Sequence, residues 1–115
     1  MKLETPKSYA AYFVGGEEFK RKADIIDRAK ELFGPWEAQR PPLEGDARAF
    51  FIDLLHHHPE WNQKTQKRPD SEIDLRPEYM SGSYGLRIYH RESGFRGDDI
   101  SWRHALKYID KQITY

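Results

Sequence analysis

Residues 84–102 constrain the fold more than any other stretch of this chain. The first eight of them alternate between apolar positions and basic or aromatic positions. A period of two over this length is typical of a half-buried strand, because successive side chains point to opposite faces of a sheet. We therefore predict a strand over 84–91 with an apolar inner face and a basic, aromatic outer face. The inner positions are Tyr84, Leu86 and Ile88, and the outer positions are Arg87, Tyr89 and Arg91.

Patterns elsewhere in the chain predict further helices and strands. Apolar residues spaced three and four apart predict helices over 19–33, from 46 to the proline at 59, and from Ser101 onward. Alternating or β-branched stretches predict strands over 9–14, 72–76 and 98–100. Residues 1–8 are expected to be a mobile lead-in and 60–71 a polar surface loop. We expect a single α+β domain over 1–115, with its core in 9–110: a small, mostly antiparallel sheet with about three helices packed on one face.

Charge and composition exclude several classes of protein. Lys plus Arg and Asp plus Glu both number 19, so the formal net charge is zero. Tight, non-specific nucleic-acid binders are often strongly basic, and a neutral chain restricts any such binding to a local patch. The absence of cysteine excludes disulfides, thiolate catalysis and cysteine zinc sites. No apolar run has the length of a signal peptide or a membrane span, so we expect a cytoplasmic monomer with no membrane partner.

The outer face of the predicted 84–91 strand is the best candidate site. Its cation, aromatic and cation lie about 7 Å apart along the strand. An aromatic ring on an open sheet can stack on a base while arginines hold phosphates, which is a common way to bind single-stranded RNA. Alternatively, a helix covers the ring and the arginines pair with Asp74 or Glu78 on a neighbouring strand. The candidate RNA-binding residues are Arg87, Tyr89 and Arg91, joined by Lys64, Lys67 and Arg68 if the 60–71 loop folds over this face.

Three consecutive histidines at 56–58 suggest a metal site only weakly. Zinc ligands on a helix are usually three or four residues apart, because that spacing places them on one face. We therefore interpret these histidines as packing or capping groups at a helix end, and predict no bound metal. A metal-dependent nuclease of the His-Asn-His kind is kept as an alternative. It would use His58, Asn62, His90, Asp98 and Asp99.

No motif in the chain predicts a reaction or a cofactor. Asp98 and Asp99 precede Ser101 and His104, but no nucleophile elbow accompanies them. Carboxylates just before a helix are commonly held by its first amides. The chain lacks a phosphate-binding loop and a dinucleotide fingerprint. We therefore predict that this protein is not an enzyme and carries no cofactor.

Several short motifs follow one another in an order that matches a known family. They are 21–26 with Leu32, 51–55 with His58, Pro59 and Lys64, Ile73, the strand ending at Arg91 with Gly94, and Asp99 to Trp102. In this order they resemble the DCL (defective chloroplasts and leaves) family, or DeCL domain, over about residues 19–108. The family usually has a Gly-x-Gly where this chain has residues 66–68, Asp-Gly where it has 93–94, and Cys-Phe where it has 85–86.

The resemblance implies a role in RNA metabolism. Plant members are tied to plastid ribosomal RNA processing, and related domains lie at the tail of plant-specific RNA polymerase large subunits. No catalytic residue is established for the family, so the resemblance implies no enzyme. It transfers a candidate surface made of His58, Pro59, Asp99 and Ser101, next to Lys64 and Arg91. Alternatively, these residues are caps and turn-formers that define the fold.

Together these observations predict a non-catalytic RNA-binding or ribosomal-RNA-processing accessory module. Its expected partner is single-stranded or structured RNA. The main alternative is a protein-interaction adaptor with a protein partner. Such an adaptor would use the same sheet face, or Trp36 and Trp61 as aromatic anchors.

Overall fold

The computed structural model describes residues 9–34, 41–80 and 83–114. This part of the chain is an α+β domain with two antiparallel three-stranded sheets, which confirms the predicted class. The strands divide between two sheets, where we expected one. The first sheet has the order β2-β1-β6, with β1 (Tyr9–Val14), β2 (Glu17–Phe19) and β6 (Gln112–Thr114). The second has the order β3-β4-β5, with β3 (Ile73–Met80), β4 (Ser83–His90) and β5 (Arg96–Ile100).

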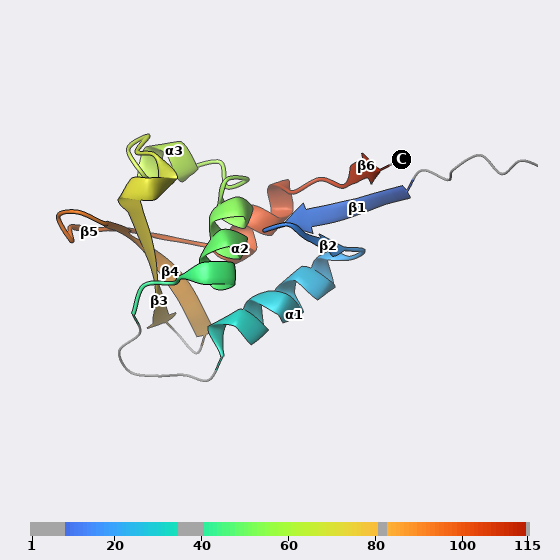
Figure 1. Ribbon diagram of the computed structural model, residues 1–115, viewed down its shortest axis with the longest axis horizontal. Helices are drawn as coiled ribbons and strands as arrows, with labels where there is room; N and C mark the ends of the chain where they lie inside the picture. The colour runs from blue at the N-terminus through green and yellow to red at the C-terminus, as the bar shows by residue number, and fades with distance from the viewer. Residues whose placement is uncertain (1–8, 35–40, 81–82, 115) are drawn as a thin grey trace, which may run out of the picture.

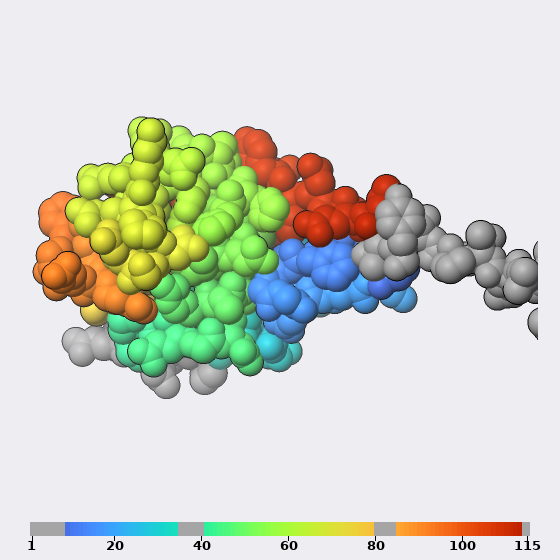
Figure 2. Space-filling view, turned by 45° about the horizontal axis from the view of Figure 1, so that its top comes forward, coloured from blue at the N-terminus to red at the C-terminus, as the bar shows by residue number. Residues whose placement is uncertain are grey.

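The two long helices lie between the two sheets (Figure 1). Figure 1 shows β1, β2 and β6 at one end of the molecule and β3, β4 and β5 at the other. Figure 2 shows the same division at the surface, with blue and red segments at one end and yellow and orange segments at the other. The helical elements are α1 (Lys22–Phe33), α2 (Gly45–Leu55), α3 (Trp61–Lys64) and α4 (Trp102–Ala105), with short 3-10 turns η1 (Asp70–Glu72) and η2 (Leu106–Tyr108).

Helix α1 follows directly from its sequence pattern. Its buried residues Ile25, Ala29 and Phe33 are four apart and share one face. The helix ends at Gly34, which adopts a φ of 65° and donates its N–H to the Lys30 carbonyl oxygen. A positive φ is easily adopted by glycine, which has no Cβ, so Gly34 can end the helix while it makes this bond. The predicted helix over 19–33 is therefore confirmed from residue 22 onward, while Phe19 is the last residue of β2 and residues 20–21 form a bend between the two elements.

The core is built between α2 and the inner face of the second sheet. Aromatic rings join α2 to the other helices, since Phe51 lies 4.7 Å from Phe33 of α1 and 6.2 Å from Trp102 of α4 between ring centroids. Burial of large apolar side chains is the main favourable term in folding. The fully buried side chains of this region include Phe50, Phe51, Leu54 and Leu55 from α2, and Ile73, Leu75, Leu86 and Ile88 from the sheet. Leu86 and Ile88 thus occupy the predicted inner face.

Two segments differ from the pattern-based prediction. Strand β3 continues through Pro77 to Met80, where the prediction ended it at residue 76. This strand lies at the edge of its sheet and pairs with β4 alone, so the missing N–H of a proline interrupts no second ladder. The stretch 60–71 contains α3 and part of η1, and it buries Trp61 and Thr65. Trp61 is therefore not an exposed anchor, and Trp36 lies outside the described residues.

None of the helices in the described part of the chain is both long and apolar enough to cross a membrane.

Candidate nucleic-acid interface

The register of the second sheet gathers arginines on its outer face. In the β3–β4 ladder, Arg76 lies opposite Arg87 and Asp74 lies opposite Tyr89. In the β4–β5 ladder, Arg96 lies opposite Tyr89, after an irregularity between residues 87 and 89. The outer positions 74, 76, 78, 87 and 89 all retain solvent exposure, whereas the inner positions between them are buried. We call the set Arg76, Arg87, Tyr89, Arg91 and Arg96 the arginine face.

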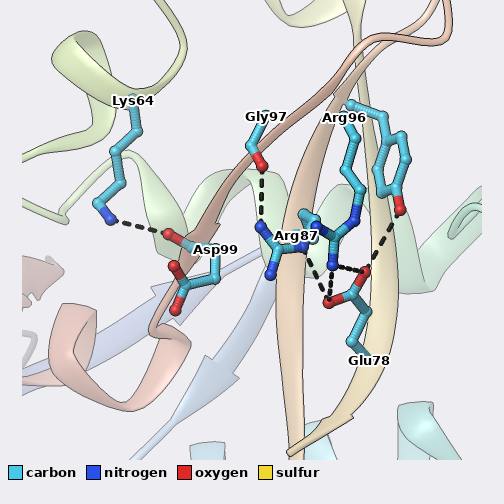
Figure 3. Close-up of polar contacts among 7 residues, drawn as sticks. Lys64, Glu78, Arg87, Arg96, Gly97 and Asp99 are labelled. Atoms are coloured by element: carbon cyan, nitrogen blue, oxygen red, sulfur yellow. Dashed lines mark hydrogen bonds and ion pairs between the residues drawn. The ribbon is translucent and has the colours of Figure 1, made fainter.

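Glu78 holds the centre of the arginine face together. Its carboxylate accepts a hydrogen bond of 2.9 Å from Arg87 Nε, one of 3.4 Å from Arg96 Nη2 and one of 3.3 Å from the Tyr89 hydroxyl. Figure 3 shows Glu78 reached by both arginines. Burial alone would raise the pKa of Glu78, but the Arg87 hydrogen bond and the charges of Arg87 and Arg96 outweigh it. The pKa of this carboxyl is therefore lowered.

Tyr89 is covered by an arginine. The guanidinium carbon of Arg76 lies 4.6 Å from the centroid of the Tyr89 ring, a cation–π arrangement. Arg76 Nε is buried and has no hydrogen-bond partner in the described part of the chain. Arg76 therefore differs from Arg87, Arg91 and Arg96, each of which binds a carboxylate.

Arg91 lies where the arginine face meets the end of β4. Its Nε donates to Asp74 Oδ1 over 2.9 Å, and its Nη1 lies 3.5 Å from the Ser71 carbonyl oxygen. Its side chain is 46% exposed. The pairing of arginines with Asp74 and Glu78, which was the sequence-based alternative, is thus present in the structure. Counting Asp99, which lies opposite Arg87, the face carries four guanidinium groups and three carboxylates.

The three basic residues of the 60–71 stretch have separate surroundings. Lys64 Nζ donates to the Asp99 carbonyl oxygen over 2.8 Å and so ties α3 to β5 (Figure 3). Arg68 lies 3.6 Å from a Glu72 carboxylate oxygen. Lys67 adopts a left-handed φ of 58° and is exposed. The ammonium group of Lys64 is therefore used in a contact with β5, and it is not a free cation for binding phosphate.

Two of the residues transferred from the family resemblance, His58 and Ser101, meet at His104 of α4. The His58 ring packs on His104 with 5.1 Å between centroids. Ser101 Oγ accepts the His104 N–H over 3.0 Å and caps α4, which confirms the expected N-cap. Pro59 lies in the exposed turn before α3. These contacts are caps and packing contacts. They agree with the alternative interpretation of the motif residues as caps and turn-formers.

His58 is held as a neutral acceptor. It is 6% exposed, and its Nδ1 accepts the Glu60 N–H over 3.0 Å. Burial lowers the pKa of His58, and the neighbouring His104 and Lys64 lower it further, against a smaller opposite effect of Glu60. A protonated Nδ1 would donate and could no longer accept this bond.

The histidines at 56–58 do not converge. His56 Nε2 lies 2.9 Å from Asp70 Oδ2, while His58 faces His104. Across residues 9–34, 41–80 and 83–114, no three His, Asp or Glu side chains come close enough to hold a metal ion. The set His58, Asn62, His90, Asp98 and Asp99 is therefore not assembled into a metal cluster there.

Sequence reasoning missed two members of the arginine face. Arg76 could have been found, because it alternates with Ile73 and Leu75 exactly as the outer residues of the next strand do. Arg96 carries no such signal, because it follows a turn and pairs across an irregular ladder.

Comparison of the chain with protein-family models, curated proteins and solved structures finds no match in any of the three. The resemblance to the DCL family rests on the short motifs described above and stays a prediction.

Proposed function

We propose that this domain is a non-catalytic module that binds single-stranded RNA on its arginine face. The observation that carries this proposal is a solvent-open sheet face on which four arginines surround one tyrosine. Aromatic rings on open sheets stack bases, and guanidinium groups bind phosphates through two parallel hydrogen bonds. The DCL resemblance supports the same class, with ribosomal RNA processing as the setting.

Binding on this face is an exchange of carboxylates for phosphates. Arg87 and Arg96 share Glu78, and Arg91 binds Asp74, so each arginine leaves a carboxylate to take a phosphate. Arg76 has no carboxylate to leave, and is the first candidate for a phosphate contact. This competition keeps the affinity modest, which agrees with the zero net charge of the chain.

Base stacking involves Tyr89 and Arg76 together. The guanidinium already lies over the Tyr89 ring, so a base must displace it or lie on the guanidinium plane. Both ring faces and guanidinium planes stack on bases in RNA complexes. A stacked base here would be flanked by Arg87 and Arg91, the neighbouring outer positions of β4 and its end.

The test is an amide chemical-shift titration with hexauridine at low and moderate salt. We expect salt-sensitive shifts at residues 76, 87, 89, 91 and 96. The double variant Arg91→Gln with Arg96→Gln removes two exposed cations, so its affinity falls and its salt slope drops by about 0.7 per lost phosphate contact. Arg21→Gln is the matched control, since Arg21 is an exposed, carboxylate-paired arginine on the approach to α1.

Two results would count against the proposal. One is the absence of shifts on the arginine face at high concentrations of protein and RNA. The other is a loss of binding free energy for Arg21→Gln that is half that of the double variant or more. Because Arg21→Gln removes one positive charge and the double variant removes two, this result would mean that RNA responds only to the net charge of the chain.

A further inference from the structure

A pocket lies at the end of the second sheet, beside the turn from β4 to β5. Its volume is about 260 Å³, and we call it the turn pocket. Pockets for drug-sized ligands occupy about 300–1,000 Å³, so this one suits a smaller group such as a single nucleobase. Its lining residues are Arg68, Glu72, His90, Glu92 and Ser93.

Backbone hydrogen bonds hold the walls of the turn pocket in place. The His90 N–H donates to the Phe95 carbonyl oxygen over 2.9 Å, and the His90 carbonyl oxygen accepts the Gly94 N–H over 2.7 Å. On the other side, the Arg91 N–H donates to the Glu72 carbonyl oxygen over 2.9 Å. The pocket is therefore formed before any ligand arrives, which lowers the entropic cost of binding.

Two polar side chains of the pocket lack partners. His90 is 9% exposed, and its ring packs against Phe95 with 5.1 Å between centroids. No hydrogen bond to the His90 ring nitrogens or to the Glu92 carboxylate is present in the described part of the chain. Glu72, by contrast, has Arg68 3.6 Å away. The side chains of His90 and Glu92 are therefore not committed to hydrogen bonds within the fold and are available to a ligand in the pocket.

The charges of the pocket select the chemistry of that ligand. Two carboxylates against one arginine disfavour a bare phosphate. An ionised carboxylate only accepts hydrogen bonds, so it selects a ligand edge that carries donors. Guanine alone among the RNA bases has two adjacent donors on its Watson–Crick edge, N1–H and the 2-amino group. Arginine is the usual partner of the O6 and N7 acceptors on the other edge of guanine.

We propose that the turn pocket binds a guanine base of the RNA strand held by the arginine face. Glu92 accepts from N1–H and the 2-amino group, Arg68 donates to O6 and N7, and His90 forms a flat wall. Arg91 lies between His90 and Glu92 in the chain. An RNA strand with one phosphate bound to Arg91 therefore has a neighbouring base within reach of the turn pocket. This inference rests on the proposed RNA binding and adds base selectivity to it.

The experiment compares oligonucleotides that differ at one base. Fluorescence anisotropy with the full chain would measure hexauridine and hexamers carrying one central guanine, inosine or adenine. We expect the guanine hexamer to bind about tenfold more tightly than the adenine hexamer, as one bidentate base contact allows. Inosine keeps N1–H and O6 but lacks the 2-amino group, so it should fall between them.

Glu92→Gln supplies the decisive variant. The amide replaces one acceptor oxygen by a donor, so it should abolish the guanine preference and leave hexauridine affinity within twofold of the parent. Glu44→Gln is the control, because Glu44 is an exposed carboxylate before α2 with no side-chain capping bond. A preference that survives in Glu92→Gln overturns the assignment.

The outcomes separate this inference from the proposed function. Hexauridine binding without a guanine preference overturns the pocket assignment and leaves RNA binding on the arginine face intact. Guanosine 5′-monophosphate titrated alone should shift the amides of His90 and Glu92, with no need for the arginine face. If guanosine 5′-monophosphate shifts the amides of His90 and Glu92 but hexauridine does not bind, the proposed RNA binding on the arginine face is overturned. The claim that the pocket serves a base of that RNA is overturned with it. Failure of every probe overturns both.

Discussion

Replacing Glu78 by glutamine should make the domain less stable and a better RNA binder. The carboxylate is 23% exposed and accepts hydrogen bonds from Arg87, Arg96 and Tyr89. Glutamine keeps the shape and one acceptor oxygen of this side chain but removes the charge. Two opposite effects follow, because the same carboxylate that stabilises the fold competes with phosphate for the arginines.

The loss of stability follows from the Arg87 contact. Arg87 is 17% exposed, so this pair is shielded from solvent more than an ordinary surface ion pair. A hydrogen bond to a charged group contributes about 1.5–3 kcal/mol, and the amide oxygen of glutamine retains part of it. We therefore expect the free energy of unfolding to fall by about 1–2 kcal/mol at neutral pH.

The pH dependence of this loss has a definite sign. The pKa of Glu78 is lowered from its usual 4.5 in the folded protein. A lowered carboxyl pKa means that the stabilisation is complete above that usual value and is lost as the pH falls through the folded pKa. The parent and Glu78→Gln should therefore approach each other in stability below about pH 4.5.

The gain in affinity follows from the released arginines. With the carboxylate gone, Arg87 and Arg96 no longer exchange an ion pair for a phosphate. At about 1 kcal/mol for a partly exposed pair, RNA should bind about fivefold more tightly at low salt. Because Arg87 and Arg96 contact phosphates in both proteins, the salt slope should stay close to that of the parent.

Urea unfolding followed by circular dichroism and anisotropy with hexauridine over a salt series would measure both effects. Glu44→Gln makes the same charge change away from the arginine face and should alter neither quantity by as much. If folded Glu78→Gln binds RNA no better than Glu44→Gln, Glu78 does not compete with phosphate. The arginine face is then not the RNA site.

Two further changes test the fold. Because burial lowers the pKa of His58 below its usual 6.5, the unfolded chain takes up this proton first as the pH falls, and stability should decrease below about pH 6.5. His58→Asn keeps an acceptor and should flatten the dependence of the urea-unfolding free energy on pH between about pH 5 and 7. His57→Asn is the control and should not flatten it. Identical pH profiles for the parent and His58→Asn would refute the reasoning. A Cβ on Gly15 would lie 2.8 Å from Phe50 Cα at a φ of 60°, so Gly15→Ala should cost about 1–3 kcal/mol or more in thermal unfolding. Gly16→Ala has a φ of 82° with nothing within 4 Å of its Cβ, so it isolates the backbone strain, and equal losses for the two would rule out the contact with Phe50.

The local patterns of the chain predicted its regular elements well. The alternation over 84–91 placed Leu86 and Ile88 on the buried face, and both are fully buried. The helical spacing of Ala23, Ile26, Ala29 and Leu32-Phe33 predicted α1. Ala29 and Phe33 of this set are buried, whereas Ala23 is exposed and Ile25, which the pattern placed beside the apolar face, is buried instead. Such patterns can be read from sequence because the periods of strand and helix depend only on the backbone of the same segment.

Elements that depend on distant partners were not predictable in this way. Strand β6 is three residues long and exists as a strand through its pairing with β1, which ends 98 residues before β6 begins. Trp61 lies in a polar stretch and is nevertheless buried, because α3 packs toward β5. Short segments of this kind carry too few residues for a period to be visible.

The candidate site divides along the same line. Alternation was enough to place Arg87, Tyr89 and Arg91 on one face, since a strand has only two faces. The register of β3 against β4 then decided that Glu78 binds Arg87 and that Arg76 covers Tyr89. The turn pocket needed still more, because its lining comes from segments 68–72 and 90–93, which are 18 residues apart at their nearest lining residues. Backbone periodicity is local and present in the sequence, whereas pairing and enclosure arise from contacts between distant segments and appear only when the chain has folded.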